Sequence, residues 1–233
     1  KIKHELFSGF TDNKFTFGFF GANQFRKDPL RLIHAFFEVR KEFPDICLYL
    51  HMEMSGVFNI DQYLRDYGCE IGTVIIKKQG LSYDTKSVVD AYNSIDCLIN
   101  TSLQEGLSWT LLEAMLCKIP VIAANNTAQT ELIEEDCGIA IDCPDFAFLP
   151  TITGGGNSFI ESRACNIKTL VHSMKEIIQS SILRDSLRQK GYERATNWLS
   201  GVSDINFLLE ETEKSREEIT SISISVKKND KVL

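Results

Sequence analysis

The chain has 233 residues, enough for one large domain or two small ones with a buried core. Its net charge of −7 argues against nucleic acid as a partner, and no stretch reaches the ~20 apolar residues of a membrane span. The charged N-terminus does not have the pattern of a signal peptide. Seven cysteines, an odd number without a CxxC pair, are typical of buried reduced thiols in a cytoplasmic protein.

Short apolar runs alternate with helical patterns along most of the chain, which predicts an α/β fold with a parallel sheet. The predicted strands cover residues 15–20, 46–52, 73–76, 96–100, 120–124 and 138–141. The first predicted helix begins at Pro29, and others cover residues 61–67, 85–93 and 128–134, with one more after the fourth strand. We therefore expect a Rossmann-like parallel sheet of about six strands flanked by helices.

Residues 145–165 break this rhythm with Pro150 and a run of three glycines, which predicts a surface insertion. Additional C-terminal helices are predicted from Ile167, over 182–198 and over 202–216. The expected organisation is a linker (1–14), a Rossmann-like domain (15–199), a C-terminal helix (200–218) and a frayed tail (219–233).

Polar side chains follow three of the predicted strands where each strand ends. They are Asn23, Arg26 and Lys27 after the first strand, Glu105, Gly106 and Ser108 after the fourth, and Asn125, Asn126 and Thr127 after the fifth. Ligands of open parallel sheets bind beyond the carboxyl ends of the strands. The sequence therefore predicts one shared site at this edge.

Two acids eight positions apart, Glu105 and Glu113, define the chemistry of the predicted site. Between them lie the first N–H groups of a helix, around Gly106, Leu107 and Ser108, which suit a phosphate. The two carboxylates suit hydroxyls. A ligand with hydroxyls at both ends and phosphates in the middle is a nucleotide sugar.

Positive charge for the phosphates is expected from Arg26 and Lys27, next to a helix start. No Asp-x-Asp motif follows a strand, so neither a metal nor another cofactor is indicated, and a zinc site is the weaker alternative for the cysteines. Trp109 and Leu112 are expected in the core, and the lone His51 is interpreted as structural.

These residues resemble the retaining glycosyltransferases of family 4, in the C-terminal, donor-binding domain of their GT-B fold. The matching segments are 21–27, the Glu105–Glu113 pair, 120–122 and Glu131. The family places an arginine directly after the glycine of its phosphate loop, where this chain has Ala22, so Arg26 is the substitute. Ser108 stands where the family often has a second glycine.

The resemblance implies a role for each position. Glu105 would hold hydroxyls of the donor sugar and Glu113 the ribose hydroxyls. The N–H groups of Gly106, Leu107 and Ser108 would contact the diphosphate together with Lys27 and Arg26. Asn23 would complete the donor site.

The implied reaction moves a hexose from GDP-mannose or a UDP-hexose to an acceptor hydroxyl with retention of configuration and without a metal. Enzymes of this family have an N-terminal acceptor domain of similar size, so we expect that domain to be missing from this chain. One alternative is a nucleotide-sugar-binding module or subunit of a split transferase, inactive alone. Another is a different enzyme on this architecture, such as a sugar-nucleotide epimerase or a phosphorylase.

Overall fold

The computed structural model describes residues 14–53, 55–76, 85–153 and 156–201. The strands are β1 (Phe15–Phe20), β2 (Ile46–His51), β3 (Val74–Ile76), β4 (Cys97–Asn100), β5 (Val121–Ala124), β6 (Ile139–Ile141), β7 (Asp145–Thr153) and β8 (Gly156–Ala164). The helices are η2 (Phe25–Lys27), α1 (Pro29–Arg40), α2 (Ile60–Asp66), α3 (Thr85–Asn93), α4 (Trp109–Leu116), α5 (Gln129–Ile133), α6 (Ile167–Gln179) and α7 (Ser181–Ser200). The predicted helix at 202–216, the tail and most of the linker lie outside the described residues.

Six of the strands form one parallel sheet in the order β3-β2-β1-β4-β5-β6. Successive strands run outward from β1 in one direction and from β4 in the other, so the order reverses between β1 and β4. This arrangement confirms the predicted Rossmann-like sheet. Ligand sites of such sheets lie at this reversal, beyond the carboxyl ends of the strands.

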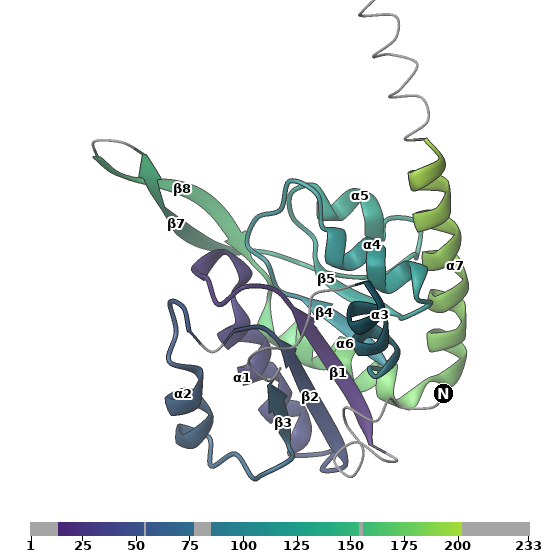
Figure 1. Cartoon of the computed structure of the whole chain (residues 1–233), viewed down its shortest axis with the longest axis horizontal. Coiled ribbons are helices and arrows are strands. Elements are labelled where there is room, and N and C mark those ends of the chain that lie inside the picture. The colour runs from purple at the N-terminus through teal and green to yellow at the C-terminus, as the bar shows by residue number, and fades with distance from the viewer. Residues whose placement is uncertain (1–13, 54, 77–84, 154–155, 202–233) are drawn as a thin grey trace, which may run out of the picture. The chain divides into compact units, whose positions relative to one another are not determined.

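Helices cover both faces of the sheet. α1 and α6 pack together on one face, where Leu32, Phe36, Met174 and Ile177 are buried in the main core. α3, α4 and α5 lie on the opposite face (Figure 1). Because both faces are covered, β1, β2, β4 and β5 are almost continuously apolar, as expected for buried parallel strands.

Local signals fix the start of two of these helices. Asp28, in the left-handed region at φ 44°, caps α1 by accepting the Arg31 N–H, and Pro29 occupies the first turn, where its missing N–H costs nothing. Asn166 caps α6 in the same way, accepting from the N–H groups of Lys168 and Thr169.

The segment at 145–165 forms an antiparallel hairpin of β7 and β8 that projects from the sheet (Figure 1). Phe146, Phe148 and Phe159 are exposed on it, and the Arg163 guanidinium lies 3.8 Å from the Phe146 ring centroid. At its base, Leu149 and Ala164 pack against Leu103. The insertion is therefore regular structure, although its proline and glycines indicated a loop.

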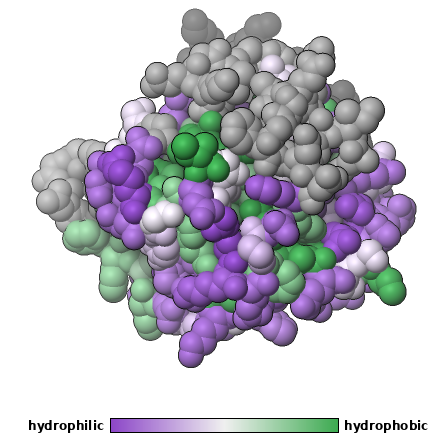
Figure 2. Space-filling view, turned by 90° about the horizontal axis from the view of Figure 1, so that it is seen from below, coloured by the Kyte–Doolittle hydropathy of each residue, from purple (hydrophilic) through white to green (hydrophobic). Residues whose placement is uncertain are grey.

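The surface and the far end of the chain add three observations. In Figure 2 the described part of the face is mainly hydrophilic, with apolar residues in small groups. Among the described helices, none has both the length and the apolar character to cross a bilayer. The chain divides into compact units of residues 1–195 and 196–233, and the second is described only at 196–201.

Candidate functional site

Loops that follow β1, β4 and β5 meet at the carboxyl edge of the sheet. The Leu103 N–H donates to the Arg26 carbonyl at 2.8 Å, and the Thr101 hydroxyl donates to the Lys27 carbonyl at 3.1 Å. The Glu105 N–H donates to the Thr127 hydroxyl at 3.0 Å. The structure thus brings together residues that lie far apart in the sequence.

Glu105 lies between the two cations that were predicted beside it. Arg26 Nη1 is 2.7 Å from Glu105 Oε2, and Lys27 Nζ is 2.5 Å from Glu105 Oε1. The Glu105 side chain is 6% exposed and the Lys27 side chain 13%, so these charges have lost most of their water. We call these three side chains the Glu105 cluster.

Ionisation of Glu105 is decided by two opposing effects. Burial opposes the charged form, but the hydrogen bond and charge of Lys27, with the hydrogen bond from Arg26, outweigh it. The pKa of Glu105 is therefore below its usual value, and the group is a carboxylate at neutral pH.

A cavity of about 790 Å³ lies next to this cluster, a volume typical of small-molecule sites. Its wall is made by residues after β1 and β2, by α3 and by α4, and it includes Gly21 and Glu113. A Cβ atom at Gly21 would lie 3.4 Å from Lys27 Cδ, so the lysine stem runs directly behind the cavity wall. Glu113 thus faces the cavity, whereas Glu105 lies beside it within its ion pairs.

The first turn of α4 has no side-chain cap. Ser108 is the N-cap residue, but its hydroxyl accepts from Asn100 Nδ2 at 2.8 Å instead of capping the helix. No described atom lies within 4 Å of a Cβ built on Gly106. The turn that holds Gly106, Leu107 and Ser108 can therefore receive an anion on its backbone.

Asn23, which was predicted to bind the donor, forms hydrogen bonds with the loop after β2. Its amide donates to the Phe58 carbonyl at 2.8 Å and accepts from the Phe58 N–H at 3.0 Å. Asn23 also lines the cavity. It therefore joins the loops after β1 and β2 and shapes the wall between them.

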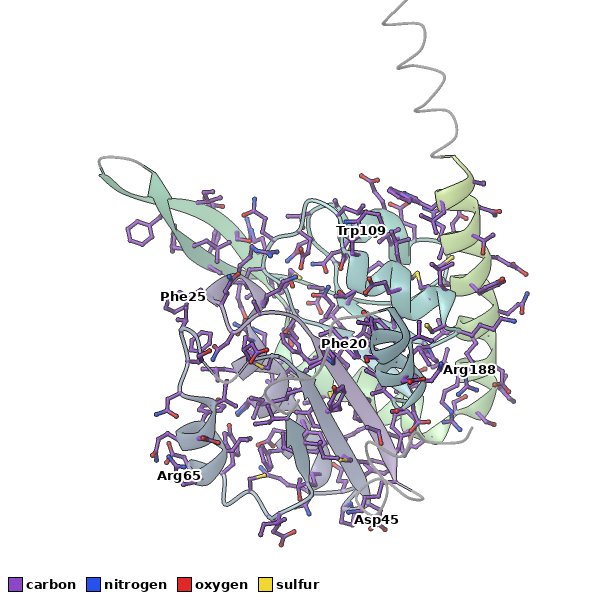
Figure 3. All side chains as sticks on the ribbon, viewed as in Figure 1. Phe20, Phe25, Asp45, Arg65, Trp109 and Arg188 are labelled. Carbon is purple, nitrogen blue, oxygen red and sulfur yellow. The ribbon has the colours of Figure 1, made fainter. Side chains whose placement is uncertain are left out.

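The prediction that Trp109 belongs to the core is wrong. This side chain is 59% exposed and projects from the first turn of α4 (Figure 3), whereas Leu112 is buried as predicted.

An aromatic stack was missed from the sequence. Phe20 lies between His51 and Tyr92, with ring centroids 4.7 Å and 4.1 Å away and nearly parallel planes. All three rings line the cavity, and Phe20 points toward α3 (Figure 3). The position of His51 at a strand end was the one available signal. Within the described ranges, no group of three or more His, Cys, Asp or Glu could hold a metal ion.

Solved structures of similar fold identify the class of this domain. The C-terminal domain of the glycosyl transferase group 1 family protein LpcC from Francisella tularensis is 22% identical with a TM-score of 0.61, over 78% of this chain and 85% of that domain. HepE from Anabaena, in complex with UDP-glucose, is 21% identical (TM-score 0.66, 88% of this chain and 50% of that one). Sucrose-phosphate synthase from Thermosynechococcus elongatus is 17% identical (TM-score 0.67, 87% and 46%). The fold is that of a Rossmann-like domain of GT-B glycosyltransferases.

The family follows from the sequence itself. The pattern of the family described as glycosyl transferases group 1 matches residues 14–153, more than half of the chain, and the chain belongs to that family. A comparison with individually curated sequences gives no match. The chain spans about half the length of HepE and of the sucrose-phosphate synthase.

Proposed function

We propose that this chain is the donor-binding domain of a retaining, family 4 glycosyltransferase that moves a hexose from a nucleoside diphosphate. The observation that carries the proposal is the Glu105 cluster beside a cavity whose wall includes Glu113. The site thus has two carboxylates, two cations paired with Glu105, and an uncapped helix turn. A diphosphate flanked by two sets of hydroxyls has the complementary pattern.

In the proposed complex, Lys27, Arg26 and the N–H groups of Gly106, Leu107 and Ser108 neutralise the diphosphate. Glu105 accepts hydrogen bonds from the hexose hydroxyls, and Glu113 accepts them from the ribose. During transfer, the bond from the anomeric carbon to the phosphate oxygen breaks and a bond to the acceptor oxygen forms on the same face. The acceptor proton goes to the leaving phosphate, whose developing charge the cations stabilise without a metal.

The donor is proposed to be a UDP-hexose or GDP-mannose. The neighbour solved with UDP-glucose supports the first. The acceptor site is proposed to come from a further domain or a partner subunit, because the described cavity accounts for the donor alone.

Direct binding tests the proposal. Melting temperatures and titration calorimetry with UDP, GDP and ADP, and with a hexose conjugate of each, should show one preferred nucleotide. Glu113→Gln should weaken its binding by about tenfold, as expected for loss of hydrogen bonds to a charged group. The exposed helical acid Glu176 provides a charge-matched control, Glu176→Gln, which should bind as the original chain does. If none of these nucleotides binds, the proposal is contradicted.

Gly106→Ala tests whether the phosphate comes close to the backbone at residue 106, because the substitution should not affect folding. Because a Cβ at Gly106 meets no described atom, the free energy of unfolding should stay within about 0.5 kcal/mol of the original. Nucleoside diphosphate affinity should fall several-fold, since the methyl group occupies space that the phosphate needs. Chemical denaturation and calorimetry measure the two effects, and unchanged affinity would remove Gly106 from the phosphate site.

A further inference from the structure

Tyr92 links two helices that both contribute residues to the cavity wall. It lies on α3, is 1% exposed, and donates its hydroxyl to Glu113 Oε2 on α4 at 2.7 Å. Its ring is stacked on Phe20, with centroids 4.1 Å apart and planes 7° from parallel. Stacking on Phe20 holds the ring, and the hydrogen bond to Glu113 holds the hydroxyl. Together these two contacts fix the position of the Tyr92 hydroxyl.

The Tyr92 hydroxyl is protonated at neutral pH and acts as a hydrogen-bond donor. Burial, followed by the charge of Glu113 and its hydrogen bond, raises the pKa of Tyr92 far above that of an ordinary tyrosine. A protonated phenol offers one proton, and the nearest strong acceptor is the Glu113 carboxylate. Glu113 thus has one oxygen engaged.

The remaining capacity of the Glu113 carboxylate faces the cavity. Among the described residues, Tyr92 is the one group whose hydrogen bond to this carboxylate is seen, and it uses Oε2. An ionised carboxylate accepts about four hydrogen bonds, so the bond to Tyr92 leaves it with capacity to accept from a ligand. The bond to Tyr92 restricts rotation of the carboxylate and so favours one orientation of its other acceptor positions.

We propose that Tyr92 is a positioning residue that orients Glu113 toward a vicinal diol, so that the cavity prefers a ribonucleoside diphosphate to its 2′-deoxy counterpart. The inference rests on the proposed function, because it assigns the cavity to the nucleoside. It adds the residue that makes Glu113 selective. A carboxylate that rotated freely would adjust its orientation to either the ribonucleotide or the deoxynucleotide, and would discriminate less between them.

The experiment compares UDP with 2′-deoxy-UDP, and GDP with 2′-deoxy-GDP, by calorimetry on the original chain and on Tyr92→Phe. The phenylalanine keeps the stacked ring and removes only the hydroxyl. The affinity ratio of ribo to deoxy nucleotide should fall by about tenfold in Tyr92→Phe, with the deoxy affinity nearly unchanged. The control is Tyr63→Phe, which removes a tyrosine hydroxyl from α2, outside the cavity lining, and should leave the ratio unchanged.

A double variant separates positioning from a general loss of stability. In Tyr92→Phe/Glu113→Gln, the loss of Tyr92 should have no further effect on the ratio, because the residue acts through Glu113. An unchanged ratio in folded Tyr92→Phe, or an equal loss for both nucleotides, would overturn the inference while the proposed function stands. Absence of binding by the original chain would instead contradict the proposed function.

Discussion

Replacing Glu105 by glutamine is expected to reverse the ligand preference of the site. Without its charge, residue 105 no longer holds Lys27 and Arg26, so a bare nucleoside diphosphate should bind a few-fold more tightly. The hexose conjugate should bind about tenfold more weakly, because hydrogen bonds to a charged acceptor contribute roughly 1.5–3 kcal/mol. Calorimetry with UDP and UDP-glucose, or with GDP and GDP-mannose, measures both changes.

The ratio of the two affinities is the decisive quantity in this experiment. Overall damage to the site would weaken both ligands equally and leave their ratio unchanged, which would mean that Glu105 does not contact the sugar. Glu176→Gln, an exposed position on α6, removes the same charge and should change neither affinity.

Lys27→Met is expected to have the largest effect on nucleotide binding. The variant removes a charge-assisted contact to the diphosphate, so we expect a loss of about 100-fold in affinity for the bare nucleotide. It also leaves Glu105, 6% exposed, with Arg26 alone, which should lower the free energy of unfolding by about 1–3 kcal/mol. Denaturation and calorimetry measure these effects, and the exposed Lys168→Met is the control.

The same variant should change the response to acid. Because the folded-state pKa of Glu105 is below its ordinary value of 4.5, its stabilising contribution is complete above pH 4.5 and is lost as pH falls through the lowered pKa. The stability difference between the original chain and Glu105→Gln should therefore shrink below pH 4.5. In the Lys27→Met background the folded-state pKa of Glu105 should lie closer to 4.5, so the loss should be smaller and should be complete at a higher pH. If the stability difference between the original chain and Glu105→Gln does not depend on pH, the cluster does not lower the pKa of Glu105 in the folded chain.

The sheet could be predicted from the sequence because its strands are short, apolar and buried on both faces. The observed bounds of the six strands in the sheet differ from the predicted bounds by at most one residue at each end, and α3 has the predicted bounds. The hairpin was missed although Phe146 and Phe148 alternate with Ala147 and Leu149, because Pro150 and the glycines are equally typical of a loop. Such a short alternation does not separate the two outcomes.

The sequence predicted which residues lie at the candidate site but not which of their side chains are in contact. Residues at the ends of parallel strands must share one edge, which brought Lys27 near Glu105 across 78 positions of sequence. The sequence does not show that the unliganded carboxylate is paired with both cations, because that depends on side-chain geometry. Tyr92 was missed because a single tyrosine on a helix carries no distinctive spacing.

The reversal of strand order between β1 and β4 divides the chain into two complementary pieces. Residues 14–76 contribute three strands and both cations of the Glu105 cluster, whereas the chain from residue 85 contributes the other three strands and both motif acids. The pieces meet along the pairing of Phe17 with Cys97 and of Gly18 with Leu98, and where α1 packs on α6. If the chain were produced as two fragments separated between these segments, the surfaces of the fragments would be complementary in shape and in charge. Nucleotide binding would then be expected only after the two fragments associate.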